Sequence, residues 1–321
     1  MTKLTKLILG SGMLLLPLCL MAKTQVNKTL DADPNSIVEI EHTAGKARIE
    51  GWDKNQVKVE GTLGDDTEEF KFERNGKTIQ IIVETETGGW GNWGGSNVDE
   101  DNLRIFVPKM ATINYQSVNA DVDILDIAGG AEVEVINGEI KAKNIAGGLE
   151  MTTVNGDLKG DDISGDVEVE AVNGDIKFSH KNGEKVQVVA VNGDIEFASE
   201  AKDIKIETVN GDMEAILTNV NSMSLDTVNG NIDVYLSLLD GARVRAASVS
   251  GDMEFFFDKD VQAKFDIEAH AGGDITNKLT NQRAQEAEFG PRSWLEFSKG
   301  NPKASVKVST VSGGITLNSK K

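Results

Sequence analysis

The residues best able to do chemistry in this chain of 321 residues are carboxylates that recur at nearly equal intervals. Oxygen ligands at regular spacing can bind calcium, and neighbouring strands would set these about 4.8 Å apart. The GGxGxD pattern of calcium-binding β-rolls is absent, however, and an acid after glycine is typical of a solvated turn. We interpret the acids as structural and predict no metal site, with calcium binding as an alternative. The column comprises Asp121, Glu139, Asp157, Asp175, Asp194, Asp212, Asn231 and Asp252.

Paired carboxylates could also cleave polysaccharides, as they do in some β-helix enzymes. An active site would break the repeat at one place, whereas these acids return in every unit. The chain has no Ser-His-Asp order, HExxH, GxSxG or glycine-rich phosphate loop, and His42, His180 and His270 have no obvious partners. We expect these histidines at surface or corner positions. The sequence predicts no catalytic residue and no cofactor, and a polysaccharide-acting enzyme stays as an alternative.

A third feature is the segment GGWGNWGGSNVDEDN, residues 88–102, which holds two of the four tryptophans among glycines. Aromatic side chains on glycine-rich loops are common in binding surfaces, including those that stack on sugars. The same rings could instead fold back and cover the open end of the first repeat. Trp90 and Trp93 are therefore candidates either for partner binding or for an end plug.

The acids belong to a repeat that organises most of the chain. The phrase Val-Asn-Gly-Asp-Ile or a close variant returns nine times, with its asparagines 18 or 19 residues apart. Stacked asparagines can hydrogen-bond through their side-chain amides, as in other cross-β ladders, and we expect each amide to be buried. The predicted structural column contains Asn119, Asn137, Asn155, Asn173, Asn192, Asn210 and Asn229, followed by Ser250 and Ser312.

Apolar and polar residues alternate strictly on both sides of each asparagine, which indicates strands with one buried face. The small inward residues Thr153, Ala171, Ala190, Thr208 and Thr227 imply a thin core. A meander of hairpins and a β-solenoid both fit the alternation, since Asn-Gly is also a hairpin signal. Constant repeat length favours the solenoid, because each coil must lie in register on the next. We predict an all-β, single-stranded parallel β-solenoid, or β-helix, with coils of 18–19 residues.

The composition excludes several classes of partner. There are 33 basic and 52 acidic residues, and the net charge of −19 disfavours binding to nucleic acid. Residues 1–22 combine two lysines, an apolar stretch and Ala22, a pattern typical of a cleavable signal peptide that also removes the single cysteine, Cys19. Loss of this segment takes the net charge to −21, and no later run approaches the length of a membrane helix. We predict export to the periplasm or cell surface.

The rest of the chain is predicted to form one solenoid domain, residues 23–321. Its N-terminal coils and the tryptophan loop cover 35–110, and regular repeats cover 111–277. An excursion over 278–303 contains two of the five prolines and one plausible helical turn, Gln282 to Phe289. Residues 304–321 return as the last coil.

Three stretches together resemble the bacterial family of putative adhesins, adhesin-like β-helix domains of unknown function. They are VEIEHTAGKARIEGWDKNQVKVEG, LRIFVPKMATINYQSVNADVDI with the repeats that follow, and FGPRSWLEFSKGNPKASVKVSTVSGGITL. The resemblance covers nearly all of residues 35–318 and implies an exported envelope protein, but no reaction. We expect a non-enzymatic, adhesin-like structural or interaction protein whose partner is an envelope or extracellular protein or glycan.

The tryptophan loop yields a direct test. If the rings plug the first coil, changing Trp90 and Trp93 together to Ser lowers the melting temperature, because burying one large side chain stabilises by about 1.5–3 kcal/mol. Partner capture per folded molecule then stays intact, which is the result we expect. An unchanged melting curve with lost capture would identify the loop as a binding surface instead, because aromatic anchors dominate interface energy.

Overall fold

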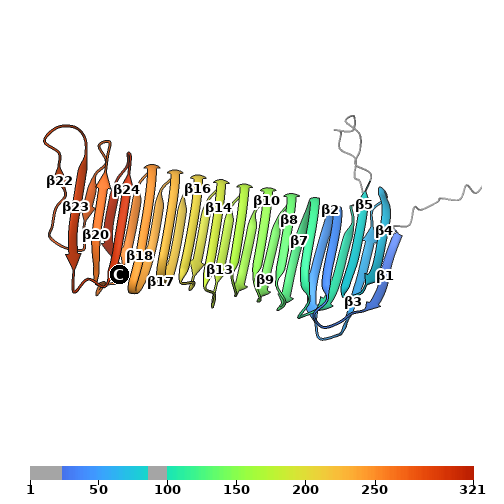
Figure 1. Cartoon of the computed structure of the whole chain (residues 1–321). Coiled ribbons are helices and arrows are strands. Elements are labelled where there is room, and N and C mark those ends of the chain that lie inside the picture. The colour runs from blue at the N-terminus through green and yellow to red at the C-terminus, as the bar shows by residue number, and fades with distance from the viewer. Residues whose placement is uncertain (1–23, 86–99) are drawn as a thin grey trace, which may run out of the picture.

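The computed structural model describes residues 24–85 and 100–321, which form a long rod of stacked strands (Figure 1). The prediction of an all-β fold is confirmed: the described residues form 25 strands and no helix, and most neighbouring strands are parallel. Partners in the central pairings are 18 or 19 residues apart, as in Asn155 with Asn173 and Asn173 with Asn192. This parallel register contradicts the hairpin meander for the repeats, because hairpin strands would pair antiparallel.

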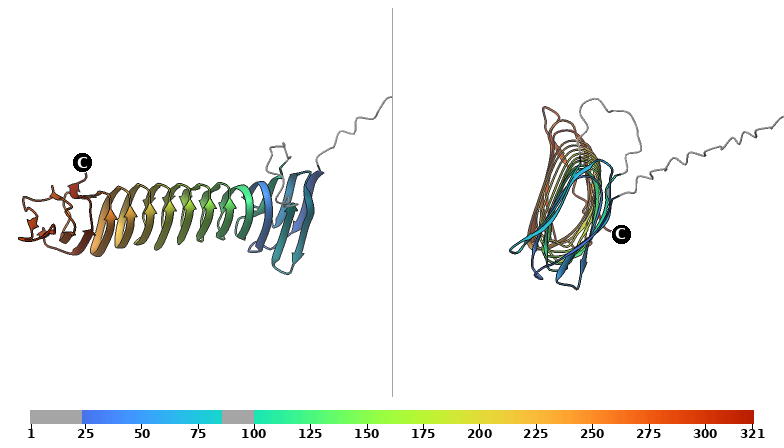
Figure 2. Two further views of the ribbon diagram at one scale, coloured as in Figure 1. Left: turned by 90° about the horizontal axis from the view of Figure 1, so that it is seen from above. Right: turned by 90° about the vertical axis from the view of Figure 1, so that its right-hand side faces the viewer.

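Each repeat contributes one strand before its asparagine and one after it, and these stack into two sheets. Seen along the rod, the coils superimpose as a flattened oval (Figure 2). The first sheet contains β8 (Ala131–Asn137), β10 (Leu149–Asn155), β12 (Val167–Asn173), β14 (Lys185–Asn192), β16 (Asp203–Asn210) and the later halves of β17 (Met213–Asn229) and β18 (Ile232–Ser250). The second sheet contains β9 (Ile140–Ile145), β11 (Leu158–Ile163), β13 (Ile176–His180), β15 (Ile195–Ser199), the earlier halves of β17 and β18, and β19 (Met253–Phe257).

The core lies between the two sheets and follows the alternation of the sequence. Val169 and Ile176 point inward from the two strands of one coil and are at most 1% exposed. The five small residues expected inside are all buried, and they line the core beside the asparagine bend. Near the C-terminal end the core holds larger side chains, and Phe265 stacks on Phe297 at 4.6 Å between ring centroids.

The N-terminal end is closed by strands that leave the repeat and double back. The first coil of the sequence, β2 (Ile37–Trp52), pairs with β7 (Thr112–Ile127) on one side and with β5 (Thr78–Thr85) and β6 (Asn102–Pro108) on the other. Outside it, β4 (Thr67–Asn75) pairs antiparallel with β5, and β3 (Gln56–Leu63) lies between β6 and β1 (Thr24–Asp31). The first coil in sequence is therefore not the first in space.

The C-terminal end has the same arrangement. β24 (Ala304–Thr310) inserts between β18 and β20 (Ala263–Ala269), and β25 (Ile315–Ser319) between β19 and β21 (Ile275–Asn277). β23 (Ser293–Lys299) then covers β20 antiparallel, with the short β22 (Gln285–Glu286) beside it. The expected helical turn from Gln282 to Phe289 is wrong, because this segment is irregular apart from Gln285 and Glu286, which pair antiparallel with β23.

A buried polar cluster ties the N-terminal strands together. His42 Nδ1 lies 2.9 Å from the Tyr115 hydroxyl, and His42 Nε2 lies 3.4 Å from Asp101 Oδ2. The other Asp101 oxygen accepts hydrogen bonds from the Gly64 N–H at 2.6 Å and the Thr67 hydroxyl at 2.7 Å. Burial opposes ionisation of Asp101, but the hydrogen bonds from His42, Gly64 and Thr67 outweigh it and hold its pKa below the usual range.

This cluster predicts a pH-dependent contribution to stability. Because the folded-state pKa of Asp101 lies below its unfolded value, the stabilisation is complete above about pH 4 and is lost as pH falls through the folded pKa. We expect Asp101→Asn to lower the free energy of unfolding by about 1.5–3 kcal/mol at pH 7, the scale for hydrogen bonds to a charged group. Urea titrations of both proteins from pH 7 to pH 3 should show this difference shrinking in acid. A difference in the free energy of unfolding that stays constant down to pH 3 would contradict the lowered pKa of Asp101.

Candidate functional site

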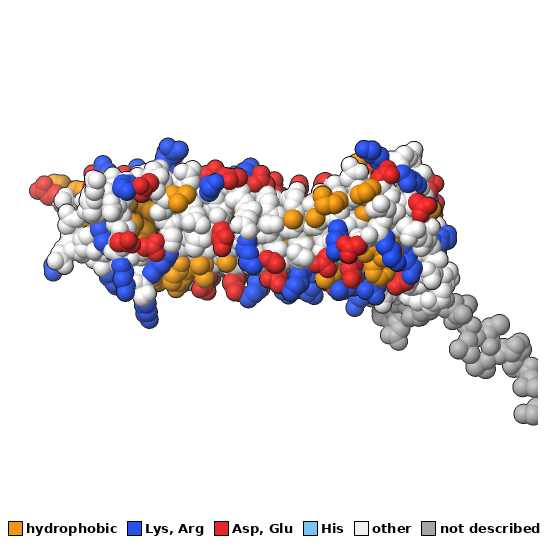
Figure 3. All heavy atoms as spheres, turned by 90° about the horizontal axis from the view of Figure 1, so that it is seen from below, with side chains coloured by type: hydrophobic (Ala, Val, Ile, Leu, Met, Phe, Trp, Pro, Cys, Tyr) orange, Lys and Arg blue, Asp and Glu red, His pale blue; other side chains and the backbone are white. Residues whose placement is uncertain are grey.

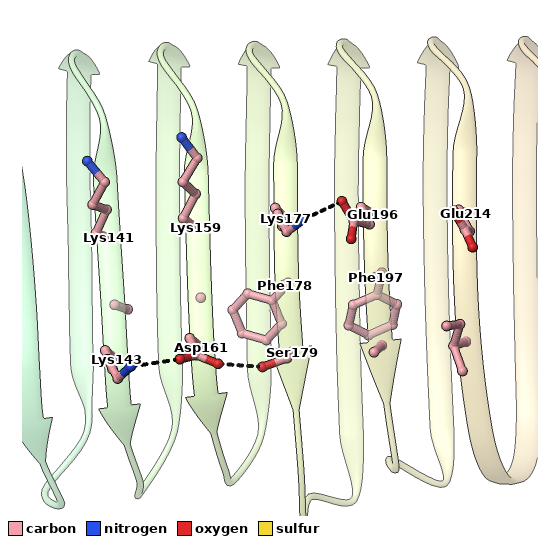
Figure 4. Close-up of a pocket in the computed structure, with 14 residues that line it drawn as sticks. Lys141, Lys143, Lys159, Asp161, Lys177, Phe178, Ser179, Glu196, Phe197 and Glu214 are labelled. Carbon is pink, nitrogen blue, oxygen red and sulfur yellow. Dashed lines mark hydrogen bonds and ion pairs between the residues drawn. The ribbon is translucent and has the colours of Figure 1, made fainter.

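The second sheet carries a hollow of about 430 Å³ on its outer face, over β9, β11, β13, β15 and β17. Strand alternation turns every second side chain outward here, while Phe178 and Phe197 point into the core and are 2% exposed. We call this surface the lysine hollow. Its outward side chains are Lys141, Lys143, Lys159, Asp161, Lys177, Ser179, Glu196, Ala198, Glu214 and Ile216 (Figure 4).

One file of equivalent positions crosses the lysine hollow from coil to coil. Lys141, Lys159 and Lys177 occupy the same position on successive coils, and Glu196 and Glu214 occupy it on the next two. The sign of the charge therefore changes once along the file, between β13 and β15. Along this file the ammonium groups lie at one end of the hollow and the carboxylates of Glu196 and Glu214 at the other.

The charged groups of the hollow are held by one another. Lys143 pairs with Asp161 at 3.0 Å, and Asp161 also accepts a 3.2 Å hydrogen bond from the Ser179 hydroxyl (Figure 4). Lys177 pairs with Glu196 at 2.6 Å. These side chains are about half exposed or more, so the pairs fix orientation more than they stabilise the fold.

Lys141 and Lys159 both bind the carboxylate of Glu139, at the edge of the same sheet. Burial raises the pKa of Glu139, but the hydrogen bonds from the two lysines outweigh it and leave the pKa low. The hydrogen bond to Glu139 in turn raises the pKa of Lys159. Both shifts move these pKa values away from neutral pH, which makes Glu139 a weak general base and Lys159 a weak general acid.

The hollow is accordingly built for contact with polar groups. The Ser179 hydroxyl donates to Asp161 and accepts from the Asp162 N–H at 3.1 Å. The hydrogen bond from Lys143 lowers the pKa of Asp161, so this carboxylate is a weak base for activating the hydroxyl as a nucleophile. Fixed charges of both signs, with Ile216 beside them, can bind hydroxyl, ammonium or carboxylate groups of a ligand. The lysines spaced 18 residues apart, Lys141, Lys159 and Lys177, are a sequence signal for this surface that the acidic and asparagine columns do not include.

The predicted asparagines lie in a single column at the bend between the two sheets. Each amide nitrogen donates to the amide oxygen of the preceding coil over 2.7–3.0 Å, from Asn137 to Asn229. The column ends with the Ser250 hydroxyl donating to Asn229. Most of these side chains are exposed, which contradicts the expectation of buried amides. The hydrogen bonds run along the column, and the rest of each side chain at the bend is open to solvent.

The acidic column beside it has a specific partner, the backbone of the next coil. Asp157 Oδ1 accepts from the Asp175 N–H at 3.1 Å, and Asp175 Oδ1 from the Asp194 N–H at 2.9 Å. The same contact recurs up to Gly314 N–H, which donates to Asp252. Within residues 24–85 and 100–321, no group of three or more His, Cys, Asp or Glu side chains is arranged to hold a metal ion.

The remaining candidates are placed differently from one another. Trp90 and Trp93 lie outside the described residues. His42 and His180 are each 2% exposed, so the expectation that they are surface or corner residues without partners is wrong. His180 binds the Ser199 hydroxyl and the Gly165 carbonyl, whereas His270 is exposed and lies 3.6 Å from Glu268.

A family model described as Toastrack DUF4097 matches residues 35–318. The chain belongs to this family. The resemblance to adhesin-like domains of unknown function is thereby confirmed, and no curated protein matches the chain. A putative adhesin from Bacteroides fragilis is 12% identical, with 92% of this chain and 98% of that one covered and a TM-score of 0.39. A putative adhesin from Parabacteroides distasonis is 10% identical, with 92% of this chain and 97% of that one covered and a TM-score of 0.38. The part of the chain that the structure describes contains no helix long and apolar enough to cross a membrane.

The two columns should differ in their response to substitution. Asn173→Ala removes one exposed amide from the stack, so we expect a loss of about 0.5–1.5 kcal/mol, the net value of a hydrogen bond, rather than the larger cost of a buried group. Asp175→Asn keeps an oxygen that accepts from the Asp194 N–H, and should change stability by less than about 0.5 kcal/mol. Urea unfolding measures both. Equal damage from the two changes would contradict the hydrogen-bond assignment.

Proposed function

We propose that this protein is an exported, non-enzymatic, adhesin-like interaction protein of the bacterial cell envelope, periplasmic or at the cell surface. In this proposal the chain is a single-stranded β-solenoid with coils of 18–19 residues, and its outer faces present side chains to a partner. Membership of the Toastrack DUF4097 family and the predicted signal peptide at residues 1–22 support export of an adhesin-like domain.

The observation that carries the proposal is the mutual pairing of charged groups in the lysine hollow. Lys143, Asp161 and Ser179 satisfy one another, as do Lys177 and Glu196. Acidic and basic side chains are also spread along the whole rod (Figure 3). Such surfaces give orientation and selectivity to a complex, because each charge already has a fixed position before the partner arrives. This favours recognition over catalysis.

The hollow suits a partner that offers both hydroxyl and charged groups, which describes an envelope glycan or an extracellular protein. In the file from Lys141 to Glu214 the ammonium groups precede the carboxylates, so a bound segment that follows this file would have a preferred direction along the rod. No nucleic acid is expected as partner, because the net charge is −19.

The experiment is capture of envelope material on immobilised protein spanning residues 23–321, with cross-linking. We expect the double change Lys143→Gln and Lys177→Gln to reduce capture roughly fivefold to tenfold, as loss of two charged contacts weakens binding by about 1–1.4 kcal/mol. Lys259→Gln, in the exposed turn after β19, is the control outside the hollow and should capture normally.

Equal capture by the double variant and the control would contradict a role for the hollow. Release of reducing sugar ends from an acidic polysaccharide would contradict the non-enzymatic proposal and favour the alternative of a polysaccharide-acting enzyme. A rise in melting temperature with calcium would favour the third hypothesis, a calcium-responsive envelope protein.

A further inference from the structure

The outer face of the first sheet carries an apolar column that the lysine hollow does not involve. The residue before each ladder asparagine, or before its serine equivalent, points outward at the edge of this sheet. Seven of these side chains are 38–47% exposed from β8 onward, although all are β-branched and apolar. They are Ile136, Val154, Val172, Val209, Val228, Val249 and Val311. A stripe of this length is unusual on a face that has no partner.

A charged file runs parallel to this apolar column and changes sign along the rod. Equivalent outward positions on successive strands from β8 to β24 pair in register, so their side chains form one row. The row is acidic at its N-terminal end and basic at its C-terminal end. In spatial order it contains Glu132, Glu150, Glu168, Gln187, Lys205, Ser224, Arg245 and Lys307.

The acids of this row lack the counter-ions that the lysine hollow has. Among the described residues, Glu132, Glu150 and Glu168 make no ion pair, and neither does Arg245 at the other end. Burial raises the pKa of Glu150, and its neighbours Glu132 and Glu168 raise it further. At the basic end, Lys205 pairs with Glu207 at 2.9 Å and Lys307 with Asp266 at 3.4 Å. Glu150 and Arg245 therefore stand on one face with opposite charges, separated by several coils and unable to reach each other.

We propose that this face binds the same face of a second copy of the chain, with the two rods antiparallel. A two-fold axis lies in the interface, parallel to the strands, and passes between β14 and β16. Reversal of the rod brings the acidic end of one row over the basic end of the other. This is an isologous interface, in which each contact occurs twice.

The register of the strands specifies which residues meet. Counting strands outward from the axis sets β10 opposite β18 and β8 opposite β24. Glu150 of each copy then faces Arg245 of the other, and Glu132 faces Lys307. Lys185 on β14 likewise faces Asp203 on β16.

The apolar columns coincide under the same operation. Because the axis is parallel to the strands, a position near the end of a strand faces the same position on the other copy. Val172 of one copy therefore faces Val228 of the other. The exposed apolar column becomes buried at the edge of the interface. Burial of apolar surface supplies the affinity, and the ion pairs select the register.

The size of the face is sufficient for a stable dimer. Eight strands about 4.8 Å apart, each of about seven residues at 3.3 Å, cover roughly 850 Å² on each copy. A stable interface typically buries about 800 Å² per partner. The net charge of −19 opposes association at long range, but at physiological salt the Debye length of about 8 Å screens this repulsion more than the contacts across the interface.

The test is the mass in solution of residues 23–321, by sedimentation over a dilution series at physiological salt. We expect a dimer for the unchanged protein. Because the Glu150–Arg245 contact occurs at two places in the dimer, Glu150→Arg and Arg245→Glu each set like charges opposite one another at both. Each variant should raise the dimer dissociation constant at least tenfold. An equimolar mixture of the two single variants should dimerise again, because each copy then offers the charge that the other lacks. The double variant should also dimerise.

Glu214→Arg is the matched control, since this exposed acid lies on the outer face of the second sheet and should leave the dimer unchanged. Circular dichroism melts check that each variant is folded. A monomeric unchanged protein would overturn the proposal, as would a dimer that both single variants retain. Disruption by the single variants without recovery in the mixture would overturn the two-fold geometry and point to a cationic partner of another kind.

Discussion

The fold depends on how closely the backbones of successive coils approach at the asparagine bend. A Cβ added to Gly174 would lie 1.9 Å from the Gly156 carbonyl oxygen, and one added to Gly193 would lie 2.0 Å from the Gly174 oxygen. The same contact recurs from Gly138 to Gly313, with φ between +101° and +155° at these glycines. Only glycine combines this conformation with so close an approach. The bend therefore fixes the position of one coil on the next.

The other regular features follow from that contact. Coils that meet at a fixed point must have nearly constant length, so side chains at equivalent positions form continuous columns. The Asn173 amide then reaches Asn155, and the Asp157 carboxylate reaches the Asp175 N–H. The same stacking places charged side chains in rows on both outer faces, which gives the rod two different surfaces. On one face Lys143 pairs with Asp161 and Lys177 with Glu196. On the other, Lys205 and Lys307 are paired, whereas Glu150 and Arg245 make no ion pair among the described residues.

Much of this was predictable, because a repeat of constant length constrains every coil at once. The strands, the inward residues and the asparagine column follow from spacing and alternation alone. The ends were not predictable in the same way, since the insertion of β24 between β18 and β20 depends on pairing between residues 62 and 41 apart in sequence. The partners of His42 and the lysine hollow were missed for a related reason: each depends on which outward or inward positions the stacking brings together.

The most direct test of the account is the free energy of unfolding of Gly174→Ala compared with Gly241→Ala. Both glycines have positive φ, +155° and +88°, but a Cβ at Gly241 meets no atom within 4 Å. We predict a loss of about 1–2 kcal/mol for Gly241→Ala from backbone conformation alone, and of more than about 3 kcal/mol for Gly174→Ala, which also separates two coils. Equal losses in urea titrations would contradict the claim that backbone contact at this bend determines the stacking.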